Sequence, residues 1–148
     1  MPPRKPTNDE FCPVARSVDL IGDRWSLMIV RNAFDGMSRF GDFQRSLGVA
    51  RNILSDRLRK LVEAGILELQ GASDGTAYQE YVMTTKGESL FPVVVALRQW
   101  GEQHLFAPGE RHSLLIDTHT GKPVPFMAPA GQDGAVLTTA DTHVQKVK

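Results

Sequence analysis

The hydrophobic period of the chain changes at Gly65, and this change limits the folds that the sequence can adopt. Before Gly65, the apolar residues Leu54, Leu58 and Leu61 recur at the spacing of an amphipathic helix. After it, the stretches ILELQG and AYQEYVMT alternate in the manner of strands and are separated by the turn-rich ASDGT. The sequence therefore predicts a helix that ends at Gly65 and is followed by a β-hairpin.

Three further helices are predicted before this one. The stretch PVARSVDLIG begins at Pro13, a favoured first helical residue, and stops at Gly22. The stretch DRWSLMIVRNAF follows Asp23 as N-cap and is apolar on most sides, so we expect it to be buried. RFGDFQRSL is a short helix, and only GVA joins it to the next one. Two short helices with a three-residue link, followed by a hairpin, predict a winged helix-turn-helix.

The part of the chain after the hairpin is predicted to begin with a long helix. Thr85 and Glu88 have the spacing of a capping box for KGESLFPVVVALRQWGEQHL, and Pro92 should kink that helix. In HSLLIDTHTG and AVLTT we expect short strands. The predicted class is α+β, mainly α, with a flexible arm at 1–11, a winged helix-turn-helix domain at 12–105 that includes flanking dimerisation helices, and a small C-terminal extension at 106–148.

Composition narrows the class of protein. Cys12 is the one cysteine, which excludes an internal disulfide framework and fits a reducing cytoplasm. The N-terminus has no apolar core of a secretory signal, and no apolar run is long enough to span a bilayer, so we expect a cytoplasmic protein without a membrane partner. Net charge is zero, but residues 1–65 hold 11 Lys and Arg against 8 Asp and Glu. The basic half contains the helix before Gly65.

The outward face of that helix carries amides, hydroxyls and cations opposite its leucines. An isolated charged helix is more often simply solvated. The preceding short helix, the short link and the hairpin instead favour contact with double-stranded DNA, in which amides and guanidinium groups read bases and cations meet phosphates. The residues expected at base edges are Arg51, Asn52, Ser55, Asp56 and Arg59. Those expected at phosphates are Arg39, Arg45, Arg57 and Lys60.

Residues 11–105 resemble the HxlR family of bacterial winged-helix transcriptional regulators. The matching motifs are Cys12-Pro13, Gly22 to Trp25, Arg39-Phe40, LSDRLRKLVEAGIL and YVMTTKGESLFPVVVALRQWGEQHL. The resemblance implies a homodimer that binds a pseudo-palindromic operator. Two features depart from the family pattern: the hairpin tip ASDGT has no Lys or Arg and carries Asp74, and the tail has no cysteine.

Cys12 precedes a predicted helix, where free amides and the helix dipole stabilise a thiolate. The resemblance also implies a role in sensing oxidants or electrophiles, whereas the plainer alternative is a half-buried cap without chemistry. Apolar residues of the helices and the tail predict a dimer interface or a pocket for a small-molecule effector. These residues are Trp25, Phe91, Val95, Trp100 and Phe106.

Enzyme chemistry is not expected. The four histidines are scattered, and no metal-binding, nucleophile or phosphate-loop motif occurs, so the sequence predicts no catalytic residue, metal or cofactor. The sequence predicts a transcriptional repressor that is relieved by a small molecule or by thiol modification. The alternative is a winged-helix module for protein–protein contact, which the lack of Lys and Arg at the tip of the hairpin favours.

Overall fold

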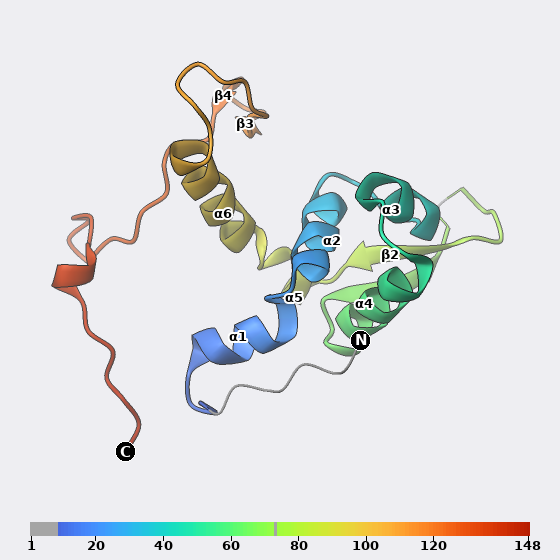
Figure 1. The fold of residues 1–148 in the computed structure, drawn as a ribbon, viewed down its shortest axis with the longest axis horizontal. Coiled ribbons are helices and arrows are strands. Elements are labelled where there is room, and N and C mark those ends of the chain that lie inside the picture. Colours follow the sequence, from blue (N-terminus) through green and yellow to red (C-terminus); the bar gives the residue numbers. More distant parts are fainter. Residues whose placement is uncertain (1–8, 73) are drawn as a thin grey trace. The chain divides into compact units, whose positions relative to one another are not determined.

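A computed structural model describes residues 9–72 and 74–148. It divides into one unit up to Pro92 and a second from Val93 to Lys148, and each is described by itself. The structure is mainly helical with two small antiparallel sheets, which confirms the α+β class (Figure 1). The first eight residues of the predicted arm lie outside the described residues. No helix in residues 9–72 and 74–148 is long and apolar enough to cross a membrane.

The first two helices begin and end where their capping residues predict. Helix α1, Pro13–Ile21, starts with the Ala15 N–H donating to Cys12 Sγ over 3.4 Å. Helix α2, Arg24–Phe34, starts with the Ser26 N–H donating to the Asp23 carboxylate over 3.0 Å. The expectation that α2 is buried is largely confirmed, because Arg24 is its one exposed residue, although its fully buried residues lie mainly on one side. Those residues are Ser26, Ile29, Val30 and Asn32.

Helices α3, Phe40–Leu47, and α4, Arg51–Glu63, form the helix-turn-helix. Gly48, at φ 61°, takes the left-handed conformation that turns the chain between them. Phe43 on α3 and Leu54 and Leu58 on α4 are fully buried. Helix α2 packs against both α3 and α4. The core therefore fixes which side of α4 faces outward.

A β-hairpin follows α4, as the change of period predicts. Strands β1, Leu67–Gly71, and β2, Gln79–Met83, pair antiparallel with Leu69 opposite Tyr81. The Tyr81 N–H also donates to the Ser38 carbonyl over 2.7 Å, which ties the hairpin to the residues before α3. We call residues 67–83 the wing. Ser73, in the predicted tip, lies outside the described residues.

The prediction of a single long helix after the wing is wrong. The structure has a short helix α5, Thr85–Glu88, and a separate helix α6, Phe91–His104. A proline ring clashes with the carbonyl four residues earlier, so one helix cannot run through Pro92 without strain. The break instead places Pro92 in the first turn of α6, where its missing N–H costs nothing.

The prediction that Thr85 and Glu88 form a capping box is also wrong. The cap is Thr84, whose hydroxyl oxygen accepts from the Gly87 N–H over 3.0 Å. Gly87 is buried against the backbone of Ile66, and a Cβ at this position would overlap the Ile66 carbonyl oxygen. The close approach of α5 to the start of the wing therefore requires glycine at this position.

In the second unit the tail follows α6 with little regular structure. Strand β3, Ile116–Asp117, falls in the predicted HSLLIDTHTG stretch and pairs with β4, Lys122–Pro123. The AVLTT stretch forms an isolated bridge at Val136 in place of a strand, and a 3₁₀ helix η1 spans Thr139–Asp141. Both ends of the buried Gln99 amide hold the tail: Nε2 donates to the Pro125 carbonyl over 2.9 Å, and Oε1 accepts from the Met127 N–H over 2.7 Å.

Candidate nucleic-acid interface

The outer side of α4 presents a polar face whose direction is set by the core. Since Leu54, Leu58 and Leu61 are buried, the residues on the opposite side of the helix turn outward. The structure exposes Arg51, Asn52, Ser55, Arg59 and Lys60. The first three lie in the first two turns of the helix, the part that usually enters the DNA major groove.

Asp56 lies in the middle of this face and binds three cations. One of its oxygens accepts from Arg57 over 2.6 Å and lies 3.3 Å from Lys60 Nζ, and the other accepts from Arg59 over 2.7 Å. Partial burial acts to raise the pKa of Asp56, but the hydrogen bonds from Lys60 and Arg59 outweigh it and lower the pKa. The carboxylate is therefore ionised at neutral pH, and both of its oxygens are engaged.

Arg57 connects α4 to the start of α2. Its Nε donates to the Asp23 carboxylate over 3.0 Å, and Asp23 also caps α2. Only 16% of the Arg57 side chain is exposed, although the sequence pattern places this residue at a phosphate. Burial acts to raise the pKa of Asp23, whereas hydrogen bonds from Ser26 and Arg57 lower it, and the lowering effect dominates.

Arg39 is held by the wing. Its Nη2 donates to Asp74 over 2.6 Å, lies 3.7 Å from Glu80, and its guanidinium stands over the Tyr78 ring. The Thr76 backbone amide first, and then Arg39, lowers the pKa of Asp74 to about 2. The sequence pattern does not reveal this contact, because Arg39 and Asp74 lie 35 residues apart.

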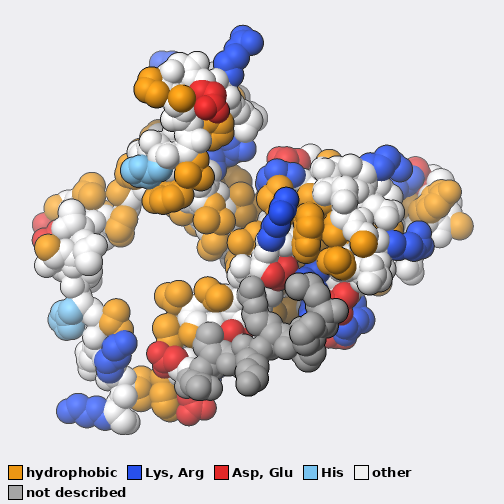
Figure 2. All heavy atoms as spheres, in the orientation of Figure 1, with side chains coloured by type: hydrophobic (Ala, Val, Ile, Leu, Met, Phe, Trp, Pro, Cys, Tyr) orange, Lys and Arg blue, Asp and Glu red, His pale blue; other side chains and the backbone are white. Residues whose placement is uncertain are grey.

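The two remaining predicted phosphate contacts are exposed cations. Arg45 pairs with Asp42 one turn earlier on α3, and its side chain is 76% exposed. Lys60 is half exposed beside Asp56. Figure 2 shows blue and red side chains interspersed over the unit that contains α3, α4 and the wing. On the part of this side that is visible, cations and acids are mixed and form no broad basic patch.

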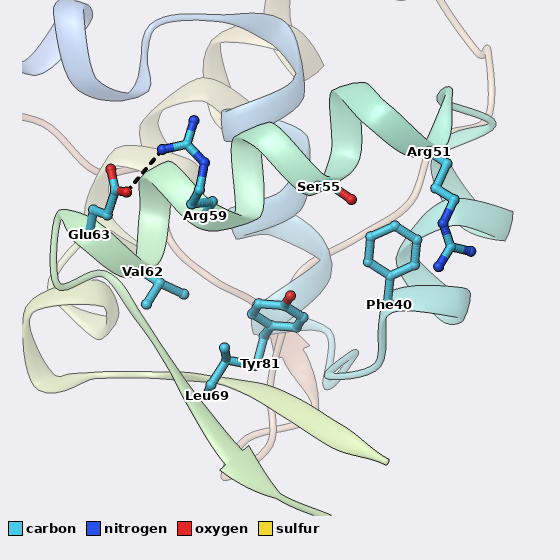
Figure 3. A pocket seen from close by; sticks show the side chains of 8 residues that line it. All are labelled: Phe40, Arg51, Ser55, Arg59, Val62, Glu63, Leu69 and Tyr81. Atoms are coloured by element: carbon cyan, nitrogen blue, oxygen red, sulfur yellow. Dashed lines mark hydrogen bonds and ion pairs between the residues drawn. The ribbon is translucent and has the colours of Figure 1, made fainter.

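A hollow of about 310 Å³ lies between α4 and the wing (Figure 3). It brings together three of the five predicted base-reading residues, Arg51, Ser55 and Arg59. The other lining residues are Phe40, Val62, Glu63, Leu69 and Tyr81. The sequence pattern does not reveal this hollow, although Leu69 and Tyr81 occupy matching places in the two alternating strands.

The apolar residues predicted for an interface or effector pocket fall in both units. In the first unit, Trp25 lies beneath the Arg24 guanidinium at 4.7 Å, and Phe91 packs edge-on against Phe34 at 5.3 Å. In the second, Trp100 is 58% exposed and Phe106 lies beside the His112 ring. Cys12 is half-buried at the start of α1.

Helix α6 has a covered and an exposed side, and Val95, predicted for the dimer interface or effector pocket, lies on the covered side. Val95 is 4% exposed and lies on the same side of α6 as the buried Gln99. At about 100° per residue, Val93, Leu97 and Trp100 share the opposite side, and all three are exposed. The exposed apolar face of α6 is therefore defined by these three residues.

Residues 20–108 match the model of the HxlR-like helix-turn-helix family. The chain belongs to this family. It is 44% identical over 107 residues, 72% of its own length and 67% of the relative's, to the uncharacterized HTH-type transcriptional regulator Rv3095 of Mycobacterium tuberculosis. A family of transcriptional regulators, and not an enzyme family, thus accounts for the winged helix-turn-helix.

Two solved structures extend the comparison. The crystal structure of PA1607, a candidate transcription factor, is 50% identical to this chain with a TM-score of 0.88, and the match covers 94% of this chain and 97% of that one. The redox regulator HypR in its reduced form is 29% identical with a TM-score of 0.58, over 64% of this chain and 94% of that one. No group of His, Cys, Asp or Glu side chains that could hold a metal ion occurs in the described part of this regulator.

Proposed function

We propose that this HxlR-family regulator is a homodimeric repressor whose α4 helix reads a pseudo-palindromic operator in double-stranded DNA. The observation that carries the proposal is the outward face of α4, where Arg51, Asn52 and Ser55 are exposed near the helix start. Guanidinium and amide groups at this end of a recognition helix suit the edges of guanine and adenine.

The contacts of the charged residues refine their proposed roles. Arg59 and Asp56 bind each other, so either must give up an existing bond to meet a base edge. Arg45 and Lys60 are exposed and suit phosphates. Arg57 and Arg39 are engaged by Asp23 and Asp74, and we assign them chiefly to positioning α4 and the wing.

Binding to labelled duplexes tests the reading of bases. Asn52→Ala should weaken binding to the intergenic DNA upstream of the gene by about 1–3 kcal/mol, with a smaller effect on a shuffled duplex. Lys60→Ala should instead weaken binding to both duplexes alike. It should also make the slope of log K against log salt concentration shallower by about one. Gln103→Ala, on the exposed surface of α6, is the control for loss of an amide. It should change neither the affinity for the upstream duplex nor that for the shuffled one. Equal losses on both duplexes for Asn52→Ala would rule out base reading by this residue.

Two routes for signal input stay open. Cys12 accepts a hydrogen bond at the start of α1, and the similar protein HypR is a redox regulator, which supports thiol modification. Exposed aromatic residues such as Trp100 support a small-molecule effector. If the signal acts at Cys12 or at an effector site away from α4, it must favour a state whose recognition helices are wrongly spaced for DNA.

A Cys12→Ser variant separates the two routes. If the thiol is the switch, peroxide or a quinone should release wild-type protein from DNA and leave the variant bound. If wild type ignores these oxidants, Cys12 acts as a structural cap and the thiol route is excluded.

The alternative function is a protein–protein module without an operator. It is favoured by the wing tip, where Asp74 rather than a cation is exposed and already binds Arg39. Failure of the wild-type protein to distinguish the upstream duplex from the shuffled one would favour this alternative.

A further inference from the structure

The hollow between α4 and the wing has the chemistry of a small-molecule site. Its base is formed by the wing, where Leu69 and Tyr81 are paired across the two strands and therefore point to the same side of the sheet. Helix α4 forms the facing wall with Ser55 and Val62, and Phe40 at the start of α3 closes one end beside Arg51 (Figure 3).

The lining is more apolar than contact with a phosphate backbone requires. Phe40, Val62, Leu69 and the Tyr81 ring contribute apolar surface, and Leu69 is 42% exposed although it stands beside charged side chains. Charged phosphates cannot bury this apolar surface favourably, whereas an aromatic ring can. The hollow, at about 310 Å³, lies at the lower end of the volumes of ligand pockets, which fits a small aromatic molecule.

The polar groups of the hollow favour an anion. Arg59 is occupied by Glu63 at 2.9 Å and by Asp56 at 2.7 Å. Arg51 differs, because its guanidinium stands 5.0 Å from the centre of the Phe40 ring and forms no ion pair with a carboxylate of the described residues. The Tyr81 hydroxyl points from the wing toward α4, and the Ser55 hydroxyl lies on the facing helix, so both can donate to an acid group (Figure 3).

We propose that this hollow binds a small aromatic carboxylate, with its ring against Leu69 and Tyr81 and its acid group at the Phe40 end of the hollow, on Arg51. Arg51 and Ser55 are also proposed to contact bases, so bound ligand and DNA exclude each other directly. The competition rests on the proposed DNA-binding function, whereas the ligand site does not. Such a ligand would release DNA at the recognition helix itself, without a change in the spacing of the two subunits.

The ligand site is tested first without DNA, with 2-naphthoate as the probe and 2-naphthylmethanol as its neutral match. Saturation-transfer NMR and amide shifts should show 2-naphthoate binding with shifts at Arg51, Ser55, Leu69 and Tyr81. The neutral alcohol cannot form the charge-assisted bond to Arg51, so its affinity should be about tenfold or more below that of 2-naphthoate. Equal binding of both probes, or no binding of naphthoate at millimolar concentration, would overturn the proposal.

Three variants locate the site. Arg51→Gln and Leu69→Asn should each lower naphthoate affinity about tenfold or more, because each removes one of the two proposed contacts. Arg45→Gln, on the exposed surface of α3, is the matched cation control and should bind naphthoate like wild type. Thermal unfolding of each variant checks that the fold persists. A folded Arg51→Gln or Leu69→Asn protein that binds naphthoate normally would place the ligand elsewhere and overturn the proposal.

Competition is then measured with the upstream duplex. Naphthoate should raise the apparent Kd for DNA in proportion to its occupancy of the hollow, and should do so less in Leu69→Asn. Binding at the hollow that leaves the DNA affinity unchanged would contradict the competition and the proposed path of DNA across α4. The ligand site itself would stand in that case, so the two failures are distinguishable.

Discussion

At the scale of single residues, carboxylates organise the cations of the DNA-facing unit. Asp23 caps α2 and binds Arg57, Asp56 binds three cations of α4, and Asp74 holds Arg39. The more exposed of these ion pairs, at Asp74 and between Asp56 and Arg59, contribute little stability, but all of them restrict where long side chains point. In the proposed function, the basic residues of the face are thus placed before DNA arrives, and Arg45 and Lys60 must each exchange a carboxylate for a phosphate.

The titration of Asp74 tests the contact at the wing tip. Its pKa of about 2 lies below the usual value, so any stability from the contact is complete above about pH 4 and is lost as the pH falls toward 2. In Arg39→Gln the pKa should rise but stay below the ordinary value, since the Thr76 amide still donates to the carboxylate. Carboxyl carbon shifts measured by NMR against pH report this directly. An Asp74 titration that is unchanged in Arg39→Gln would show that the two side chains do not pair in solution.

At the scale of the elements, the junction between α4, the wing and α5 depends on contacts to the backbone rather than on the hydrophobic period. Thr84 accepts from the Gly87 N–H and its hydroxyl donates to the Gly65 carbonyl, so one residue joins the end of α4 to the start of α5. Gly87 allows α5 to lie against Ile66. Together these contacts fix where the chain leaves the wing.

Two glycine substitutions separate close packing from helix propensity. Gly87→Ala should lower the free energy of unfolding by about 1–3 kcal/mol, because the new Cβ overlaps the Ile66 carbonyl. Gly101→Ala is the matched control inside α6, where the new Cβ meets only Leu105 Cδ1 at 3.9 Å. It should be neutral or raise the free energy of unfolding by up to about 1 kcal/mol. Urea unfolding measures both, and equal stability of the two variants would refute the close contact at Gly87.

At the scale of the whole molecule, the proposed two-fold assembly needs an apolar surface that the single chain leaves uncovered. The exposed face of α6 (Val93, Leu97 and Trp100) supplies one, and Phe11, Val14 and Val18 of the α1 region supply another. A two-fold dimer can place two recognition helices about one turn of DNA apart.

Leu97→Glu tests this assembly without disturbing the core, since Leu97 is 51% exposed. The variant should sediment as a folded monomer at micromolar concentration and bind the operator at least about tenfold more weakly, because a buried charge opposes the interface. Gln103→Glu adds the same charge on another exposed side of α6 and should stay dimeric. A monomeric wild-type protein would contradict the proposed dimer outright.

Local sequence determined most of the elements of this protein. Pro13, Asp23 and Gly65 mark helix boundaries because caps and left-handed turns depend on neighbouring residues alone. The leucines of α4 fixed its outward face, since a 3.6-residue period leaves one side for the core. The family motifs point to the same helix-turn-helix.

Tertiary structure alone decided how the charged residues are used and which apolar stripes are covered. Arg57 and Asp23 are 34 residues apart, and Arg39 and Asp74 are 35, so no local spacing reveals either pair. The hollow likewise needs α4, the start of α3 and both wing strands at once. On α6, a helix with apolar residues on more than one side, the pattern could not show that Val95 is buried and Leu97 exposed. Period defines the faces of a helix, but packing against the rest of the chain selects the one that is buried.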